Sequence, residues 1–243
     1  MAEKHSPLEQ FLIKPLVPIK IGSVDLSFTN SALVMVIAVV LVGLLMTKGM
    51  GKRGLVPGRL QSVAELSYEF VANLIRETVG TAGRKYFPLI FTLFMFVLFG
   101  NMLGMIPSVF TFTSHIAVTF FMAAVVFIGV TILGFVRHGT HFFSFFLPAG
   151  VPWILWPLII PIEIISYLSR PLSLSVRLFA NMLAGHALLK VLAGFVPLLG
   201  IAGIAPLLVV FALVGLEFLV AFVQAYVFTI LTCVYINDAE NMH

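Results

Sequence analysis

The chain has 243 residues, of which 60% are hydrophobic and only 10% are charged. An average soluble domain is about 25% charged, and so few charges cannot form a polar shell around a soluble fold. The composition therefore excludes a soluble enzyme, a disordered chain and a fibrous protein. It predicts an all-α, multi-pass membrane protein. The net charge is +4, but the basic residues lie beside apolar segments, so membrane orientation explains it and no nucleic acid partner is expected.

Residues 1–29 are interpreted as a mixed amphipathic arm, and residues 30–46 as the first membrane span. Only one basic residue, Lys20, closely precedes this span. Four basic residues follow it, namely Lys48, Lys52, Arg53 and Arg59. The positive-inside rule then places the N-terminus outside the cell and the following loop in the cytoplasm.

Residues 58–84 are predicted to form an amphipathic helix. Apolar residues recur there at helical spacing on one face, and polar residues fill the opposite face. The apolar set is Leu60, Val63, Ala64, Val71, Leu74 and Ile75. Such a helix lies on the cytoplasmic membrane surface or packs on a partner subunit, and the pattern leaves both alternatives open.

Residues 87–136 are predicted to form a hairpin of two spans. The first covers residues 87–106 and the second residues 116–136, and the loop up to Ser114 contains no Lys or Arg. His138 and His141 follow at a spacing that could ligate a metal, but no third ligand is evident. Interfacial histidines are the preferred interpretation, so neither a metal nor a cofactor is expected.

Residues 151–237 contain two long apolar segments, at residues 153–195 and 203–236. As straight helices they would be about 65 Å and 50 Å long, whereas the bilayer core is about 30 Å thick. They must therefore kink, split or tilt strongly. The sequence thus predicts one membrane domain over 1–243, with about five to six hydrophobic helices, a long tilted C-terminal hairpin and a cytoplasmic C-terminus.

Only five charged residues lie within 138–237: Glu163, Arg170, Arg177, Lys190 and Glu217. An arginine at the bilayer centre costs about 2.5–3.5 kcal/mol, so such residues are expected to face a partner, a cavity or an ion path. Polar residues also recur in steps of three or four along one helix face. This polar stripe consists of Glu163, Ser166, Arg170, Ser173, Arg177 and Asn181.

Further titratable and polar groups lie on other faces. His186 follows Arg177 by nine residues, half a turn around the helix, and Lys190 lies one turn beyond His186. In the last segment Glu217 and Gln224 share a face, which Tyr235 continues. Titratable groups therefore flank a permanent guanidinium cation on both sides. This is the arrangement expected of two proton paths that must not join.

Several residues have plainer interpretations. Glu163 and Arg170 could pair within one helix, and Arg170 could anchor the helix at the cytoplasmic surface. Lys190 could extend to an interface, and Asn181 could only bond a neighbouring helix. Two other classes of function remain. A secondary transporter with a midplane site would favour internal repeats, and none is evident. An intramembrane enzyme needs a nucleophile–base pair or metal ligands, and none has suitable spacing.

The segment 173–186, SLSVRLFANMLAGH, resembles the signature of subunit a of the F-type ATP synthase. Residues 101–107, NMLGMIP, resemble the motif that ends the family's first hairpin helix. Glu217 and Gln224 match the family's last helix in type and spacing. The resemblance covers nearly the whole chain. The pairing of His186 with Glu217 is similar to that of mitochondria and related alphaproteobacteria, and Met1 without a presequence fits a bacterial inner-membrane protein.

The resemblance implies a role for each matched residue. Arg177 would face the ring of c subunits and separate two aqueous half-channels. His186 and Glu217 would line the half-channel open to the periplasm, and Glu163 the one open to the cytoplasm. Supporting polar positions would be Ser173, Asn181 and Gln224. The implied partners are the c-ring, b-type peripheral stalk subunits, the other ATP synthase subunits and the lipid bilayer. ATP chemistry would occur elsewhere, since the chain has no glycine-rich phosphate loop.

Overall fold

The computed structural model describes residues 11–21, 24–25, 27–51, 57–106, 109–139, 142, 146–147 and 152–241. Within them the chain forms α1 (Asn30–Met50), α2 (Arg59–Thr78), α3 (Phe87–Gly104), α4 (Ile116–His138), α5 (Trp156–Leu198) and α6 (Ile204–Glu240). Of these, α1, α3, α4, α5 and α6 lie in segments long and apolar enough to cross a membrane. The predicted all-α membrane fold is therefore confirmed.

Shorter elements connect the helices. The 3₁₀ helices are η2 (Thr81–Tyr86), η3 (Phe112–Ser114), η5 (Trp153–Leu155) and η6 (Gly200–Gly203). The arm contains four short strands, which the sequence analysis did not predict: β1 (Pro15–Val17), β2 (Lys20–Ile21), β3 (Val24–Asp25) and β4 (Phe28–Thr29). Antiparallel pairing joins β1 to β4 and β2 to β3. The Thr29 hydroxyl then caps α1 by accepting from the Ala32 amide at 3.3 Å.

The boundaries of α1 and α2 differ from the expected ranges. Helix α1 continues to Met50 instead of residue 46, and the Thr47 hydroxyl donates to the Gly43 carbonyl at 2.8 Å within its last turns. Helix α2 ends at Thr78, because Gly80 follows with a φ of +76°. A residue with a side chain rarely adopts that conformation, and the chain resumes as η2 rather than as the same helix.

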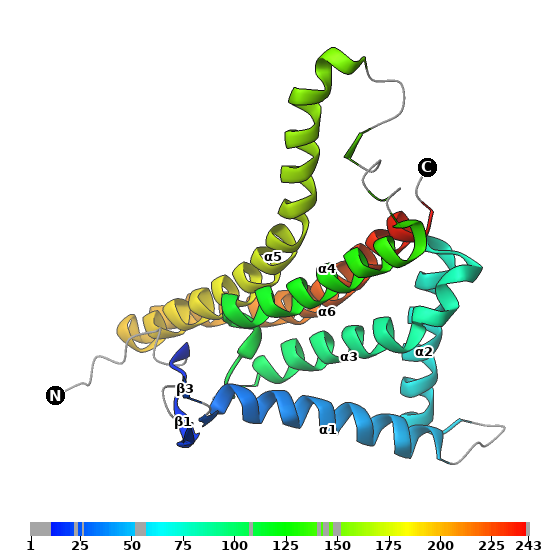
Figure 1. Ribbon diagram of the computed structural model, residues 1–243. Helices are drawn as coiled ribbons and strands as arrows, with labels where there is room; N and C mark the ends of the chain where they lie inside the picture. The colour runs from blue at the N-terminus through cyan, green and yellow to red at the C-terminus, as the bar shows by residue number, and fades with distance from the viewer. Residues whose placement is uncertain are drawn as a thin grey trace.

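Helix α2 lies across the ends of α1 and α3 (Figure 1). Its residues Val71, Leu74 and Ile75 are buried in the core of this same chain. Other apolar residues on α2 remain open, with Leu60 57% and Leu66 65% exposed. The apolar residues of α2 thus divide between the chain's own core and a surface available to lipid or to a partner.

The last two helices pack as an antiparallel pair, and α5 is strongly bent (Figure 1). Pro161 and Pro171 lie inside α5, and each removes a backbone hydrogen bond and strains the helix against the preceding turn. Beyond the bend, α5 runs beside α6, and α3 and α4 also pack on this pair. The buried core lies between α2, α3, α4, α5 and α6.

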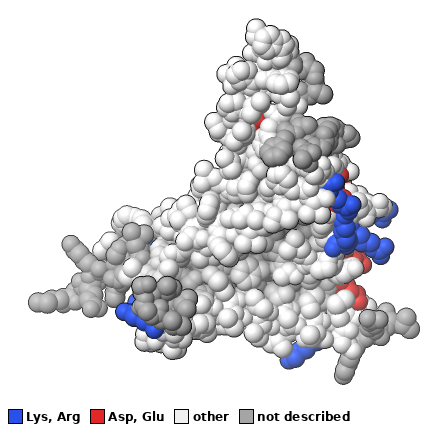
Figure 2. All heavy atoms as spheres, in the orientation of Figure 1, with Lys and Arg blue, Asp and Glu red and all other residues white. Residues whose placement is uncertain are grey.

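Helix α6 extends to Glu240, past the predicted end of the last span at residue 236. The Glu240 carboxylate accepts a hydrogen bond from the Tyr86 hydroxyl and pairs with Lys85 at 2.8 Å and Arg137 at 3.3 Å. These contacts join the ends of α6, η2 and α4. Basic and acidic side chains gather at this end of the molecule (Figure 2).

Replacing Glu240 by alanine is expected to lower the free energy of unfolding by about 1 kcal/mol, because its partners lose a charged acceptor. The side chains of Lys85 and Arg137 are 41% and 49% exposed, so water replaces part of the lost contacts. The measurement is thermal unfolding of the detergent-solubilised chain. The matched control is Glu69→Ala, since Glu69 is exposed and has no ion pair among the described residues. Equal melting of both variants would contradict the expectation.

Candidate functional site

Arg177 lies on the exposed side of α5, beyond the bend. Among the described residues it has no hydrogen-bond or ion-pair partner. Three exposed residues one turn away from it on α5 are small or polar, namely Ser173, Ala180 and Asn181. A guanidinium on a predominantly apolar membrane helix is costly without a counter-charge. The surface around Arg177 is therefore suited to contact a partner that carries a carboxylate.

Asn181 connects α5 to α6. Its amide nitrogen donates to Gln224 Oε1 at 2.8 Å. Gln224 is only 3% exposed, and three residues earlier the Ala221 carbonyl accepts from the Asn101 side chain of α3 at 3.1 Å. The possibility that Asn181 bonds a neighbouring helix is thus realised. These contacts place a polar layer between α3, α5 and α6, beside the exposed face that carries Arg177.

His186 occupies the opposite face of α5 from Arg177. It continues the buried stripe of Leu174, Leu178 and Met182 at four-residue spacing and is 8% exposed. Its Nδ1 lies 3.0 Å from Glu217 Oε1 on α6. Helices α5 and α6 therefore bring together two titratable groups that are 31 residues apart in the sequence, as the predicted pairing required.

Gly185 makes this contact possible. A Cβ atom at Gly185 would lie 2.0 Å from Glu217 Oε1, which is far inside van der Waals contact. The Glu217 carboxylate can therefore lie this close to the backbone of α5 only because Gly185 has no side chain. A glycine inside a helix costs about 1 kcal/mol relative to alanine, and here it provides the space that the carboxylate occupies.

A cleft of about 610 Å³ opens beside this pair. His186 and Glu217 lie on its wall, and Lys190 and Lys14 line it as well. The cleft extends to the N-terminal arm, since Leu12 and Asn30 also line it. It is large enough to hold many water molecules. The carboxylate–imidazole pair thus borders a space that can hold water at the arm end of the molecule.

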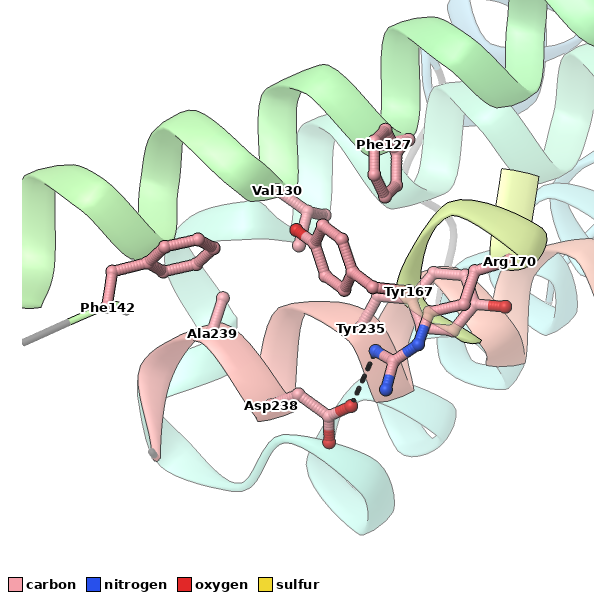
Figure 3. Close-up of a pocket in the computed structure, with 8 residues that line it drawn as sticks. All are labelled: Phe127, Val130, Phe142, Tyr167, Arg170, Tyr235, Asp238 and Ala239. Atoms are coloured by element: carbon pink, nitrogen blue, oxygen red, sulfur yellow. Dashed lines mark hydrogen bonds and ion pairs between the residues drawn. The ribbon is translucent and has the colours of Figure 1, made fainter. Parts of the chain in front are cut away.

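Arg170 forms an ion pair with a residue that the sequence analysis did not consider. Its Nη1 lies 2.9 Å from Asp238 Oδ2 of α6, as the dashed line in Figure 3 shows. The guanidinium also lies 5.5 Å from the ring centre of Tyr167 and 5.1 Å from that of Tyr235. The alternative in which Arg170 pairs with Glu163 is wrong for this structure, because no ion pair joins them among the described residues.

The remaining candidates are separate from the His186 pair. Glu163 is half-buried on the first part of α5, before Pro171, with no hydrogen-bond or ion-pair partner in the described chain. The exposed Ser173 donates its hydroxyl proton to the Arg170 carbonyl at 3.1 Å. The described residues contain no group of three side chains suited to a metal ion. His141, which the sequence analysis considered together with His138, lies outside the described residues.

Three residues at these contacts were missed from the sequence: Asp238, Gly104 and Thr111. Asp238 follows Tyr235 by three residues and continues the polar face of α6, but it lies beyond the apolar run that defined the span. Gly104 and Thr111 contact His186 at 2.9 Å and 3.0 Å. No periodicity links them to a residue more than 70 positions away in the sequence.

Comparison with known proteins places the chain in a family. The family model "ATP synthase A chain" matches residues 31–237. The chain is 62% identical to ATP synthase subunit a of Rhodospirillum rubrum over 243 residues, covering 98% of this chain and 100% of the relative. It is 57% identical to the subunit of Paramagnetospirillum magneticum and 55% to that of Pelagibacter ubique, covering 98% of this chain and 99% and 98% of those relatives. The chain belongs to the ATP synthase A chain family.

Proposed function

We propose that this chain is the proton-conducting stator subunit of the membrane sector of a rotary ATP synthase. The observation that carries the proposal is Arg177, an exposed cation on α5 without a counter-charge among the described residues. Its small neighbours let another helix approach closely. A ring of c subunits that presents a carboxylate at membrane depth would supply the missing charge.

The cleft beside His186 and Glu217 is the inlet half-channel. It opens at the arm end of the molecule, where Lys14 and Asn30 lie on its wall. Protons enter from this end, which faces the periplasm, and reach the carboxylate–imidazole pair. From Glu217 they pass the Gln224–Asn181 contact toward the ring surface beside Arg177.

The outlet half-channel lies on the other side of Arg177, toward the end where α4 and α6 finish. Glu163 provides its titratable group. Asp238 neutralises Arg170. Arg177 therefore remains as the guanidinium without a counter-charge between the two half-channels. Because an arginine cannot release its proton in a protein, it blocks a continuous proton chain between the two sides.

In the mechanism, a proton delivered through Glu217 neutralises a ring carboxylate. The neutral acid enters lipid at far lower cost than the ionised form. After almost a full turn, the acid meets the outlet side, releases its proton toward Glu163, and the carboxylate pairs with Arg177. The membrane potential contributes about 2.3 kcal/mol per proton and 100 mV. This drives rotation in one direction, and ATP forms in other subunits.

The same proposal predicts the membrane in which the chain lies and its orientation there. It spans the bacterial inner membrane with its N-terminus in the periplasm and its C-terminus in the cytoplasm. Basic residues collect on the cytoplasmic side of bacterial membrane proteins. Five described basic residues support this orientation, since they lie near helix ends on the proposed cytoplasmic side: Lys48, Arg59, Arg76, Lys85 and Arg137. The exposed apolar surface of α2 is available to b-type peripheral stalk subunits or to lipid.

Cysteine accessibility tests the two half-channels. The native Cys233 is fully buried, so it leaves a low background in this chain. A membrane-impermeant thiol reagent is expected to label Val210→Cys, in the inlet cleft, only in right-side-out vesicles. Ser169→Cys, on the outlet part of α5, is expected to react only in inverted vesicles. Labelling of both positions from one side would contradict the proposal.

A further inference from the structure

His186 has a hydrogen-bond partner on each ring nitrogen. Nδ1 faces Glu217 Oε1 at 3.0 Å. Nε2 lies 2.9 Å from the Gly104 carbonyl oxygen and 3.0 Å from Thr111 Oγ1. Gly104 is the last residue of α3, and Thr111 directly precedes η3. The imidazole is thus held between α6 on one side and the connection from α3 to α4 on the other.

The chemistry of these partners assigns one proton. A carbonyl oxygen can only accept a hydrogen bond, so the contact with Gly104 requires a proton on Nε2. The Thr111 hydroxyl lies 3.2 Å from the same carbonyl and donates to it, so its oxygen accepts from Nε2. All three contacts are satisfied by one arrangement, in which Nε2–H points at Gly104 and Thr111.

The backbone around this contact is shaped for it. Gly104 has no side chain, and a Cβ there would lie 2.6 Å from Thr111 Cγ2. The Thr111 side is also fixed, because Ser114 donates its hydroxyl proton to the Thr111 carbonyl at 2.6 Å. Thr111 is only 3% exposed, so water does not easily replace its hydroxyl as the acceptor.

We propose that Gly104 and Thr111 lock His186 with its proton on Nε2, so that His186 and Glu217 hold and exchange a single proton between Nδ1 and Oε1. Thr111 is then a positioning residue for proton transfer. Nε2–H cannot pass its proton onward, since the Gly104 carbonyl does not accept one. Protons therefore join and leave the pair through Glu217. The Glu217 side chain lines the cleft, and its second oxygen, Oε2, is buried without a described hydrogen-bond partner.

Among the described residues, the other charged groups that line the cleft beside the pair are Lys190 of α5 and Lys14 of the arm. In the connection between α3 and α4, His115 stacks on Phe110 with ring centres 5.0 Å apart. Burial lowers the pKa of His115, so it stays neutral at pH 7. The two lysines and the Nε2 acceptors are thus the described polar groups that face the pair.

The test uses the intact ATP synthase in inverted membrane vesicles, with ATP-driven proton pumping measured against pH. Thr111→Val keeps the side-chain size but removes the hydroxyl that accepts from Nε2–H, which loosens the hold on the imidazole ring. The pH at which pumping is half-maximal is expected to shift downward. Thr111→Ser restores the acceptor and is expected to restore the profile. Thr111→Cys, a poor acceptor of similar size, replaces the valine variant if valine blocks assembly.

Thr113→Val is the matched control. Thr113 lies in the same connection, is fully buried, and its hydroxyl has no described hydrogen-bond partner. Its loss is expected to leave the pH profile unchanged. A profile unchanged in both Thr111→Val and Thr111→Cys, or shifted equally in Thr113→Val, overturns the inference. The inference rests on the proposed function, whose own failure is distinguishable: Arg177→Ala would then pump normally, whatever the profile of the Thr111 variants.

Discussion

Replacement of Arg177 by alanine is expected to lower ATP-driven proton pumping and proton-driven ATP synthesis by about a hundredfold or more. Removal of a preorganised charge at a reaction centre typically costs this much. The exposed guanidinium has no ion-pair partner among the described residues, so its loss leaves the fold of this chain unchanged. It would also remove the barrier between the two proposed half-channels, and passive proton leakage is expected to increase.

The measurements are proton pumping, ATP synthesis and passive proton flow in vesicles that contain equal amounts of assembled complex. Arg170→Ala is the matched control, because it removes an arginine seven residues earlier on the same helix. Arg170 is already neutralised by Asp238 at 2.9 Å, so coupled transport is expected to fall much less. Normal pumping in Arg177→Ala would refute the proposed function.

Replacement of Gly185 by alanine is expected to reduce coupled proton transport by about ten- to hundredfold. The new methyl group would lie only 2.0 Å from Glu217 Oε1. The carboxylate must therefore move, which takes it away from His186 Nδ1. A displacement of about 1 Å can cost a hundredfold in a reaction that depends on positioning. Inlet proton transfer would then become limiting.

A shorter carboxylate provides the decisive comparison. Glu217→Asp in the Gly185→Ala background withdraws the side chain from the added methyl group, and partial recovery of transport is expected. Gly194→Ala is the control on the same helix, because a Cβ at Gly194 meets no atom of the described chain within 4 Å. The expectation would be contradicted if Gly194→Ala lost as much proton transport as Gly185→Ala. It would also be contradicted if Gly185→Ala kept full activity, because space for Glu217 would then not be the role of Gly185.

The membrane fold was predictable because hydropathy is a local property of the sequence. Arg177 was also recognisable, since an arginine within a long apolar segment is costly and therefore conspicuous. The nine-residue offset to His186 correctly predicted opposite faces of one helix, because helical geometry fixes that angle. Such conclusions need only the residues of one segment.

Contacts between segments were harder to predict. Asp238 lies outside the apolar run, so its pairing with Arg170 depended on how α5 and α6 pack. Gly104 and Thr111 reach His186 only because the α3–α4 connection folds back on the last two helices. The strands of the arm are only two or three residues long, too short for a periodic pattern to be visible.

The Arg170–Asp238 ion pair has a mechanical consequence. Under the proposed function, a ring that turns against α5 would push that helix sideways, and the stator would have to resist an equal and opposite force. The contacts of Arg170 with Asp238 and of Asn181 with Gln224 transfer this load from α5 to α6. The contact of Asn101 with the Ala221 carbonyl links α6 to α3, and Glu240 links the end of α6 to Lys85 and Arg137. The polar contacts of the site thus also brace the helix on which the torque acts.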